Sequence, residues 1–139
     1  MPTPGAESSD PIVLDTSAYS HLRAGHPDVL DLLVRAPLVY VPVIVIGELE
    51  AAFELGRRAD QNRASLAEFL SEPFVSVVDV TQATARRYGE LIGVLRRAGT
   101  PVPANDVWIA AVTMGTAGNL VTFDSDFSRV PGLRCVVLD

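Results

Sequence analysis

The sequence predicts an α/β domain with a central, mostly parallel sheet of four to five strands covered by helices. Short apolar runs typical of buried strands alternate along the chain with segments of helical periodicity, which is the pattern of β-α-β units. At 139 residues, the chain is long enough to bury a hydrophobic core without disulfides. We expect one domain over residues 11–139, preceded by a flexible N-terminal tail of residues 1–10.

The strands are predicted from the apolar runs and the helices from the intervals between them. Strands are expected at residues 12–15, 38–41, 74–78, 119–123 and 134–138. Helices are expected at residues 28–35, 43–58, 61–70, 81–98 and 105–117, the second and third forming a helical hairpin. Thr81 and Asn105 are the expected N-caps of the last two helices, which Gly99 and Gly118 end.

The charge of the chain gives two opposing indications about nucleic acid. A net charge of -6 argues against a nucleic-acid partner, but cations bound to clustered acids would reverse the local sign. All the positive charge is arginine, with adjacent pairs at Arg57-Arg58, Arg86-Arg87 and Arg96-Arg97. Arginine binds phosphate oxygens two at a time, although a solvated helix face is the simpler explanation for each pair taken alone.

Nothing in the sequence predicts a membrane or secreted protein. The longest apolar run, residues 38–47, contains Pro42 and is shorter than the roughly 20 residues that span a bilayer. The first ten residues lack the basic and apolar regions of a signal peptide. Cys135 is the single cysteine, so no disulfide can form within the chain. We therefore expect a cytoplasmic protein.

Four acidic residues lie where a predicted strand ends or a predicted helix begins. Asp15 and Asp124 follow strand runs directly, while Glu48 and Asp106 lie early in helices. In a parallel sheet these positions share the edge where ligands bind. Two carboxylates about 4 Å apart repel by roughly 4 kcal/mol at an effective dielectric of 20, so a cluster would need a cation. Oxygen ligands favour Mg²⁺ or Mn²⁺.

Each of these acids also has a structural explanation, which for Glu48 is a side chain that reaches the surface from the edge of an apolar stripe. Asp15 and Asp124 are common turn or cap residues, and the helix macrodipole favours Asp106 in a first turn. Asp126 competes with Asp124 as the fourth ligand, and Asp124 is preferred because it is nearer the strand end. The two histidines, His21 and His26, are expected at the surface rather than at a metal.

Glu48 is the acid that is hardest to explain structurally. Helical geometry places it in line with Ile44, Ala51 and Leu55, and a charge in an apolar stripe is costly unless it is paired or binds a metal. The same helix has a second apolar surface that indicates either a partner or burial against the helix at residues 61–70. That surface comprises Val45, Ile46, Leu49, Ala52 and Phe53.

Four segments together resemble the motifs of PIN-domain ribonucleases, most closely the VapC-type toxins of bacterial toxin-antitoxin pairs. They are residues 13–17, 47–49, 105–111 and 121–127, and the resemblance runs from Ile12 to the end of the chain. It implies a three-layer α/β/α sandwich, Mg²⁺ or Mn²⁺ at the acids, and cleavage of RNA. The acidic quartet would be Asp15, Glu48, Asp106 and Asp124, supported by Thr16, Ser17 and Thr122.

The resemblance also implies partners. It indicates a homodimer that a cognate antitoxin holds inactive by covering hydrophobic grooves near the active site. Val45, Leu49 and Phe53 are the residues that we expect on the partner face.

Metal-assisted hydrolysis of RNA is the leading hypothesis, and two alternatives compete with it. One is a catalytically weak PIN-fold interaction module whose acids are caps. The other is an aspartyl-phosphate receiver or phosphatase-like domain, but those families rely on a lysine and this chain has none.

Overall fold

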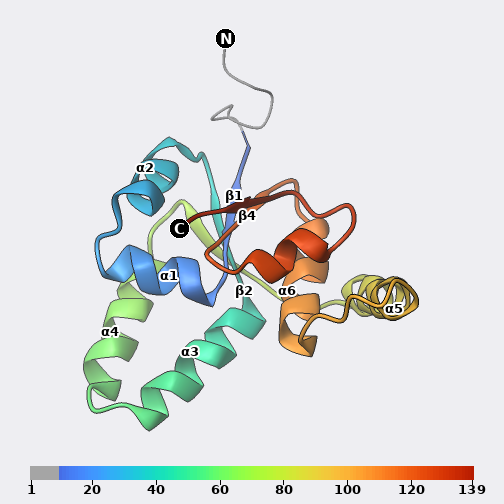
Figure 1. The fold of residues 1–139 in the computed structure, drawn as a ribbon. Helices are drawn as coiled ribbons and strands as arrows, with labels where there is room; N and C mark the ends of the chain where they lie inside the picture. The colour runs from blue at the N-terminus through green and yellow to red at the C-terminus, as the bar shows by residue number, and fades with distance from the viewer. Residues whose placement is uncertain (1–9) are drawn as a thin grey trace.

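The computed structural model describes residues 10–139, and the predicted tail lies outside this range except for Asp10, which pairs with Arg134 at 2.7 Å. The described chain alternates strands and helices (Figure 1). The elements are β1 (Ile12–Leu14), α1 (Thr16–Arg23), α2 (Pro27–Arg35), β2 (Val39–Pro42), α3 (Val43–Leu55), α4 (Ala59–Leu70), β3 (Val75–Val78), α5 (Gln82–Arg97), α6 (Ala104–Met114), β4 (Asn119–Thr122), the 3-10 helix η2 (Ser125–Arg129) and β5 (Cys135–Val137). All five predicted strands are confirmed to within one residue at each end.

The sheet is parallel throughout, in the order β3-β2-β1-β4-β5. β1 lies in the middle, and all three of its residues are buried. A strand covered on both faces has no solvent side, which explains why its sequence is continuously apolar rather than alternating.

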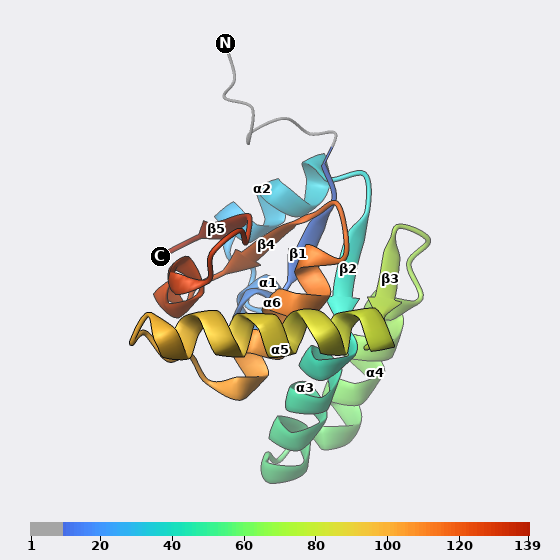
Figure 2. The ribbon, with the colours of Figure 1, turned by 90° about the vertical axis from the view of Figure 1, so that its right-hand side faces the viewer.

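Helices cover both faces of the sheet, as the three-layer prediction requires. Figure 2 shows α6, and then α5, in front of the strands, with α1 and α2 behind them. One hydrophobic core joins the sheet to α1, α3 and α4, while a second lies mainly between α5 and α6. The second core includes Leu91, Leu95 and Val107, each at most 5% exposed.

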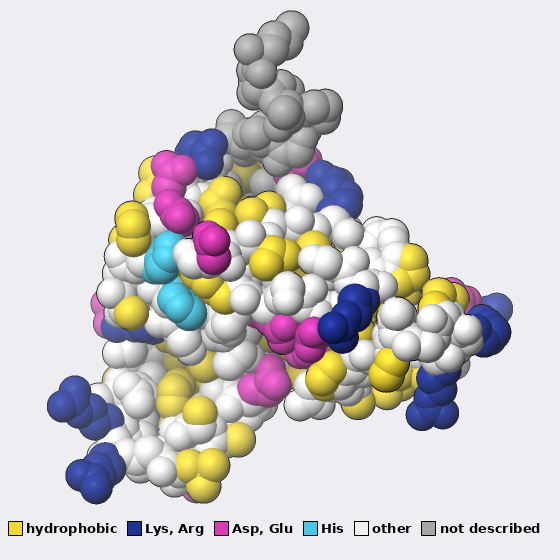
Figure 3. Space-filling model, viewed as in Figure 1, with side chains coloured by type: hydrophobic (Ala, Val, Ile, Leu, Met, Phe, Trp, Pro, Cys, Tyr) yellow, Lys and Arg dark blue, Asp and Glu magenta, His cyan; other side chains and the backbone are white. Residues whose placement is uncertain are grey.

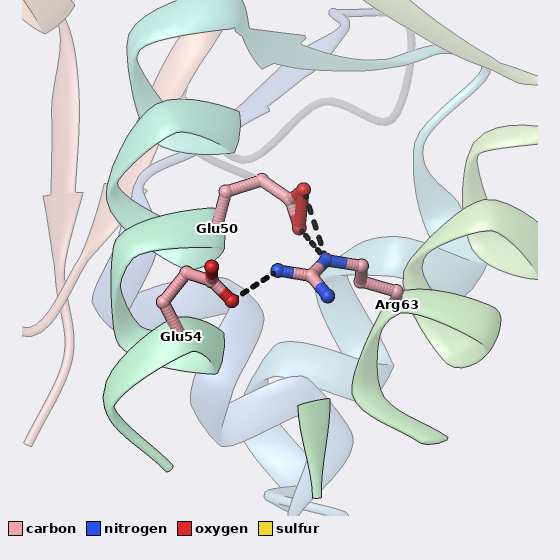
Figure 4. A network of polar contacts seen from close by, with 3 residues as sticks. All are labelled: Glu50, Glu54 and Arg63. Atoms are coloured by element: carbon pink, nitrogen blue, oxygen red, sulfur yellow. Dashed lines mark hydrogen bonds and ion pairs between the residues drawn. The ribbon is translucent and has the colours of Figure 1, made fainter. Parts of the chain in front are cut away.

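The helical hairpin α3–α4 is confirmed, and an arginine joins its two helices (Figure 4). Arg63 on α4 contacts Glu50 and Glu54 on α3, each at 2.9 Å. These side chains are substantially exposed, so the pairs contribute little free energy. They do show that Glu50 and Glu54, the other two acids of α3, have a structural role separate from that of Glu48.

Helix ends were predicted with mixed success. Thr81 caps α5 through a capping box, and Gly99 follows that helix at φ 71°, as expected. The Asn105 cap is wrong, because α6 begins after Pro103 without a side-chain cap and ends at Gly115 rather than Gly118. Helices α1 and η2 were not predicted at all.

The three residues expected on the partner face of α3 are almost entirely buried within the chain. Val45, Leu49 and Phe53 belong to the hydrophobic core and are 0%, 3% and 8% exposed. The expected stripe through Glu48 is wrong, because Leu55 is 90% exposed. Packing within the hydrophobic core explains Val45, Leu49 and Phe53.

The fold predicts very different costs for the same substitution at Leu120 and Leu55. Leu120 is fully buried in β4, so Leu120→Ala should lower the free energy of unfolding by about 2–5 kcal/mol. Leu55→Ala at the exposed end of α3 should change it by about 0.5 kcal/mol or less. Urea unfolding of both variants measures this difference, and equal costs would contradict the assigned core.

Candidate metal centre

The sheet order places two acids at the point where the chain reverses its direction of travel across the sheet. From β1 the chain continues through β2 to β3, and it later adds β4 and β5 on the other side of β1. Such a switch point opens a crevice at the carboxyl ends of the two central strands. Asp15 follows β1 and Asp124 lies just after β4, so both lie at this crevice.

Asp15 is buried and held by three hydrogen bonds. Its Oδ1 accepts from Ser17 Oγ and from the backbone N–H of Ala18, both at 2.8 Å, and its Oδ2 accepts from Thr122 Oγ1. The pairing of Leu14 with Val121 sets this geometry, because the next residues along the two strands are Asp15 and Thr122. Asp15 is therefore both the N-cap of α1 and a carboxylate at the crevice.

Glu48 reaches the same region from α3. Its Oε1 accepts a hydrogen bond from Thr16 Oγ1, and its Oε2 accepts one from Asn105 Nδ2 at 3.4 Å. Asn105, expected only as a helix cap, thus contacts an acid of the candidate site. Its position directly before Asp106 was the one feature of the sequence that could have indicated this contact.

Asp106, Asp124 and Asp126 form the tightest group of acids. One carboxylate oxygen from each lies within 4.8 Å of those of the other two. The turn after β4 brings the last two together, since Asp126 N–H donates to Asp124 Oδ1 at 2.9 Å and Asp124 N–H donates to Thr122 Oγ1 at 3.0 Å. Arg129 also contacts Asp126 Oδ1, at 3.3 Å.

Burial and mutual repulsion shift the pKa values of these carboxylates. Burial, followed by the charges of Asp124, Glu48, Asp15 and Asp126, raises the pKa of Asp106 to about 6. Burial also raises the pKa of Asp15, against the opposing effect of its hydrogen bonds. All four acids predicted from the sequence, together with Asp126, therefore belong to one electrostatic cluster.

This donor set fits a hard divalent cation. The ligand atoms are carboxylate oxygens, which suit Mg²⁺ or Mn²⁺ rather than a zinc site of His and Cys. Figure 3 shows acidic side chains gathered on one face, between α3 and α6. The structure separates the acids into a tight group of three aspartates, with Asp15 and Glu48 fixed beside it by hydrogen bonds.

Within residues 10–139, no helix combines the length and the apolar composition needed to cross a bilayer.

Comparison with known proteins gives matches along nearly the whole chain. A profile of the PIN domain matches residues 12–133. Ribonuclease VapC5 of Mycobacterium tuberculosis (strain ATCC 25618 / H37Rv) is 30% identical over 124 residues, which cover 89% of this chain and 90% of the relative.

Two solved structures have similar folds. One is the crystal structure of VapBC2 from Rickettsia felis bound to a DNA fragment from its promoter. It has a TM-score of 0.81 and 28% sequence identity, and the match covers 93% of this chain and 99% of that chain. The structure of VapBC-5 from Mycobacterium tuberculosis, a member of the VapBC family of toxin-antitoxin systems, gives 0.70 at 26% identity and covers 92% and 98%.

The raised pKa of Asp106 predicts an unusual dependence of stability on pH in the metal-free protein. The folded chain binds this proton more tightly than the unfolded chain, in which the pKa is near 3.8. The resulting stabilisation is complete below that value and is lost as the pH rises through about 6. Urea unfolding in EDTA should therefore show the free energy of unfolding falling over this range more steeply for the wild type than for Asp106→Asn. Equal slopes would contradict the assignment.

Proposed function

The chain belongs to the PIN domain family, and on that premise we propose that it is a metal-dependent endoribonuclease acting as the toxin of a toxin-antitoxin pair. The observation that carries the proposal is the cluster of acids at the switch point, where burial and then the charges of four other carboxylates raise the pKa of Asp106. The similar protein VapC5 is a ribonuclease. The similar VapBC-5 structure belongs to a toxin-antitoxin system.

The residues proposed to hold Mg²⁺ or Mn²⁺ are Asp15, Glu48, Asp106 and Asp124. When bound, the ion supplies positive charge for the phosphate and lowers the pKa of a water ligand. A cation shared by these carboxylates would offset their mutual repulsion, so the cluster is more stable with the ion bound than without it.

The remaining polar groups orient these acids before substrate arrives. Ser17 and Thr122 fix both oxygens of Asp15, while Thr16 and Asn105 fix both oxygens of Glu48. Ligands held in place by surrounding hydrogen bonds lose little entropy when the reacting groups assemble.

Binding of the RNA backbone is proposed to depend on arginine. The chain carries a net charge of -6 and no lysine, so a cation near the acids is needed to attract phosphate. Arg129 is 51% exposed and pairs with Asp126 at the edge of the acidic cluster. Its guanidinium can therefore contact a phosphate close to the metal.

The antitoxin is proposed to cover an open groove between α1, α3 and α4. The groove has a volume of about 350 Å³, and Tyr19, Arg23, Leu49, Phe53 and Asn62 are among its lining residues. Leu49 and Phe53 thus present only an edge to a partner instead of a full apolar face. A homodimer remains part of the proposal through the family resemblance.

Two glutamates on α3 provide a matched test of the catalytic role. Glu48→Gln should lower the rate of metal-dependent RNA cleavage by about 100-fold or more, because it removes a carboxylate proposed to hold the ion that stabilises the transition-state charge. Glu50→Gln should leave the rate unchanged, since Glu50 contacts Arg63 on α4. Cleavage of labelled total RNA with Mn²⁺, Mg²⁺ or EDTA measures this. Equal activity of the two variants, or cleavage in EDTA, would overturn the proposal.

Asp124 and Asp126 can be distinguished by asparagine substitutions, which remove charge but keep a side-chain oxygen for the turn. Asp124→Asn should weaken Mn²⁺ binding more than Asp126→Asn, because Asp126 already pairs with Arg129 and its charge has the smallest effect on Asp106. Calorimetric titration with Mn²⁺ compares the two variants. The reverse order would make Asp126 the fourth ligand.

A further inference from the structure

Three aromatic rings cluster around Phe123, the residue that precedes Asp124. His21 of α1 stacks on Phe123 with ring centroids 3.7 Å apart and planes inclined by 16°. His26 meets the edges of both, with its centroid 5.0 Å from that of Phe123 and 5.6 Å from that of His21. All three residues are partly exposed. We call His21, His26 and Phe123 the aromatic platform.

The aromatic platform is fixed to the same groups that fix the acids. Phe123 directly precedes Asp124, and its backbone N–H donates to Ser17 Oγ at 3.1 Å, while that hydroxyl donates to Asp15. The Nδ1 of His21 donates to the backbone carbonyl of Ser17 at 2.8 Å. Ser17 therefore connects the platform to the buried carboxylate through both its side chain and its backbone.

The hydrogen bonds made by the Nδ1 atoms of the two histidines determine whether each Nε2 atom is a donor or an acceptor. In the neutral ring of His21, Nδ1 carries the proton, so Nε2 is an acceptor. His26 Nδ1 instead accepts from the N–H of Asp28 at 3.2 Å, so its Nε2 carries the proton and is a donor. Within residues 10–139, the platform thus combines stacked aromatic surface with one donor and one acceptor that have no hydrogen-bond partner.

We propose that the aromatic platform binds an unpaired base of the RNA, in a nucleotide next to the cleaved bond. This inference rests on the proposed ribonuclease function. Unpaired bases stack on Phe and His side chains in proteins that recognise single-stranded RNA. Phe123 directly precedes Asp124, and its N–H binds the Ser17 hydroxyl that holds Asp15, so a base on Phe123 would contact the same segment that positions the acids. Figure 3 shows the histidine side chains on the same face as the acidic cluster.

The charge of the chain supports a base as the occupant. With a net charge of -6 and no lysine, the protein attracts phosphate weakly, and stacking is a contribution to affinity that does not require positive charge. Stacking therefore supplies a larger share of the RNA affinity in an acidic protein than in a basic one.

The test measures RNA binding separately from cleavage. In an Asp106→Asn background, each variant is titrated against an unstructured, mixed-sequence 12-nucleotide RNA carrying 2-aminopurine, whose fluorescence is quenched by stacking. His21→Leu and Phe123→Leu should each weaken binding by roughly 5- to 100-fold and reduce the quenching. His21→Phe should retain both. The dependence of affinity on salt should stay unchanged, because no phosphate contact is lost.

Matched controls distinguish this role from a structural one. Tyr88→Leu removes a ring that stacks on Trp108, 3.8 Å away between α5 and α6, and should not affect quenching. His26→Asn keeps an acceptor for the N–H of Asp28 but removes the ring, and should weaken binding. Thermal unfolding checks that each variant is folded.

Several outcomes would overturn the platform. The proposal is wrong if folded leucine variants bind RNA as tightly as the parent. It is also wrong if His21→Phe weakens RNA binding as much as His21→Leu does. Loss of antitoxin binding with intact RNA binding would assign the rings to the protein interface. If the wild type cleaves no RNA with any divalent metal, the proposed function fails instead, and the quenching data still report on the platform.

Discussion

The parallel pairing of β1 with β4 is the constraint on which the candidate site depends. It joins segments more than a hundred residues apart and sets Leu14 opposite Val121. The next pair, Asp15 and Thr122, then hydrogen-bonds across the end of the sheet. A shift of this register by one residue would turn every side chain to the other face, separating the buried carboxylate from its hydroxyl donor. The fold and the position of the acids are therefore determined by the same contact.

Placing five carboxylates together opposes folding in the absence of a cation. The raised pKa values of Asp15 and Asp106 show that burial disfavours their charged forms. The hydrophobic core has to offset this cost, and it does so with strands such as β1 that are buried on both faces. Clustering the acids lowers the stability of the fold but creates a strong local attraction for positive charge, a compromise that is common at functional sites.

The sequence predicted the strands and the acids well because both depend on short-range patterns. Continuous apolar runs identify buried parallel strands, and an acid directly after such a run lies at the sheet edge. Predictions that needed tertiary contacts were less successful. Asn105 was expected to cap a helix but contacts Glu48, and helical periodicity assigned Glu48 to an apolar stripe whose Leu55 is exposed. The stacking of His21 on Phe123 joins residues too distant in sequence for any local pattern to indicate it.

The choice of hydrogen-bond donors around the acids supports a cation as their ligand. Asp15 and Glu48 are oriented by the side chains of Ser17, Thr122, Thr16 and Asn105, all of them neutral. Arginine would orient a carboxylate more strongly, but its charge would also cancel the negative potential of the cluster. Where an arginine does pair with an acid of this group, it is Arg129 with Asp126, at the exposed edge. Neutral donors hold the geometry while leaving the negative charge available, which is what a binding site for a divalent cation requires.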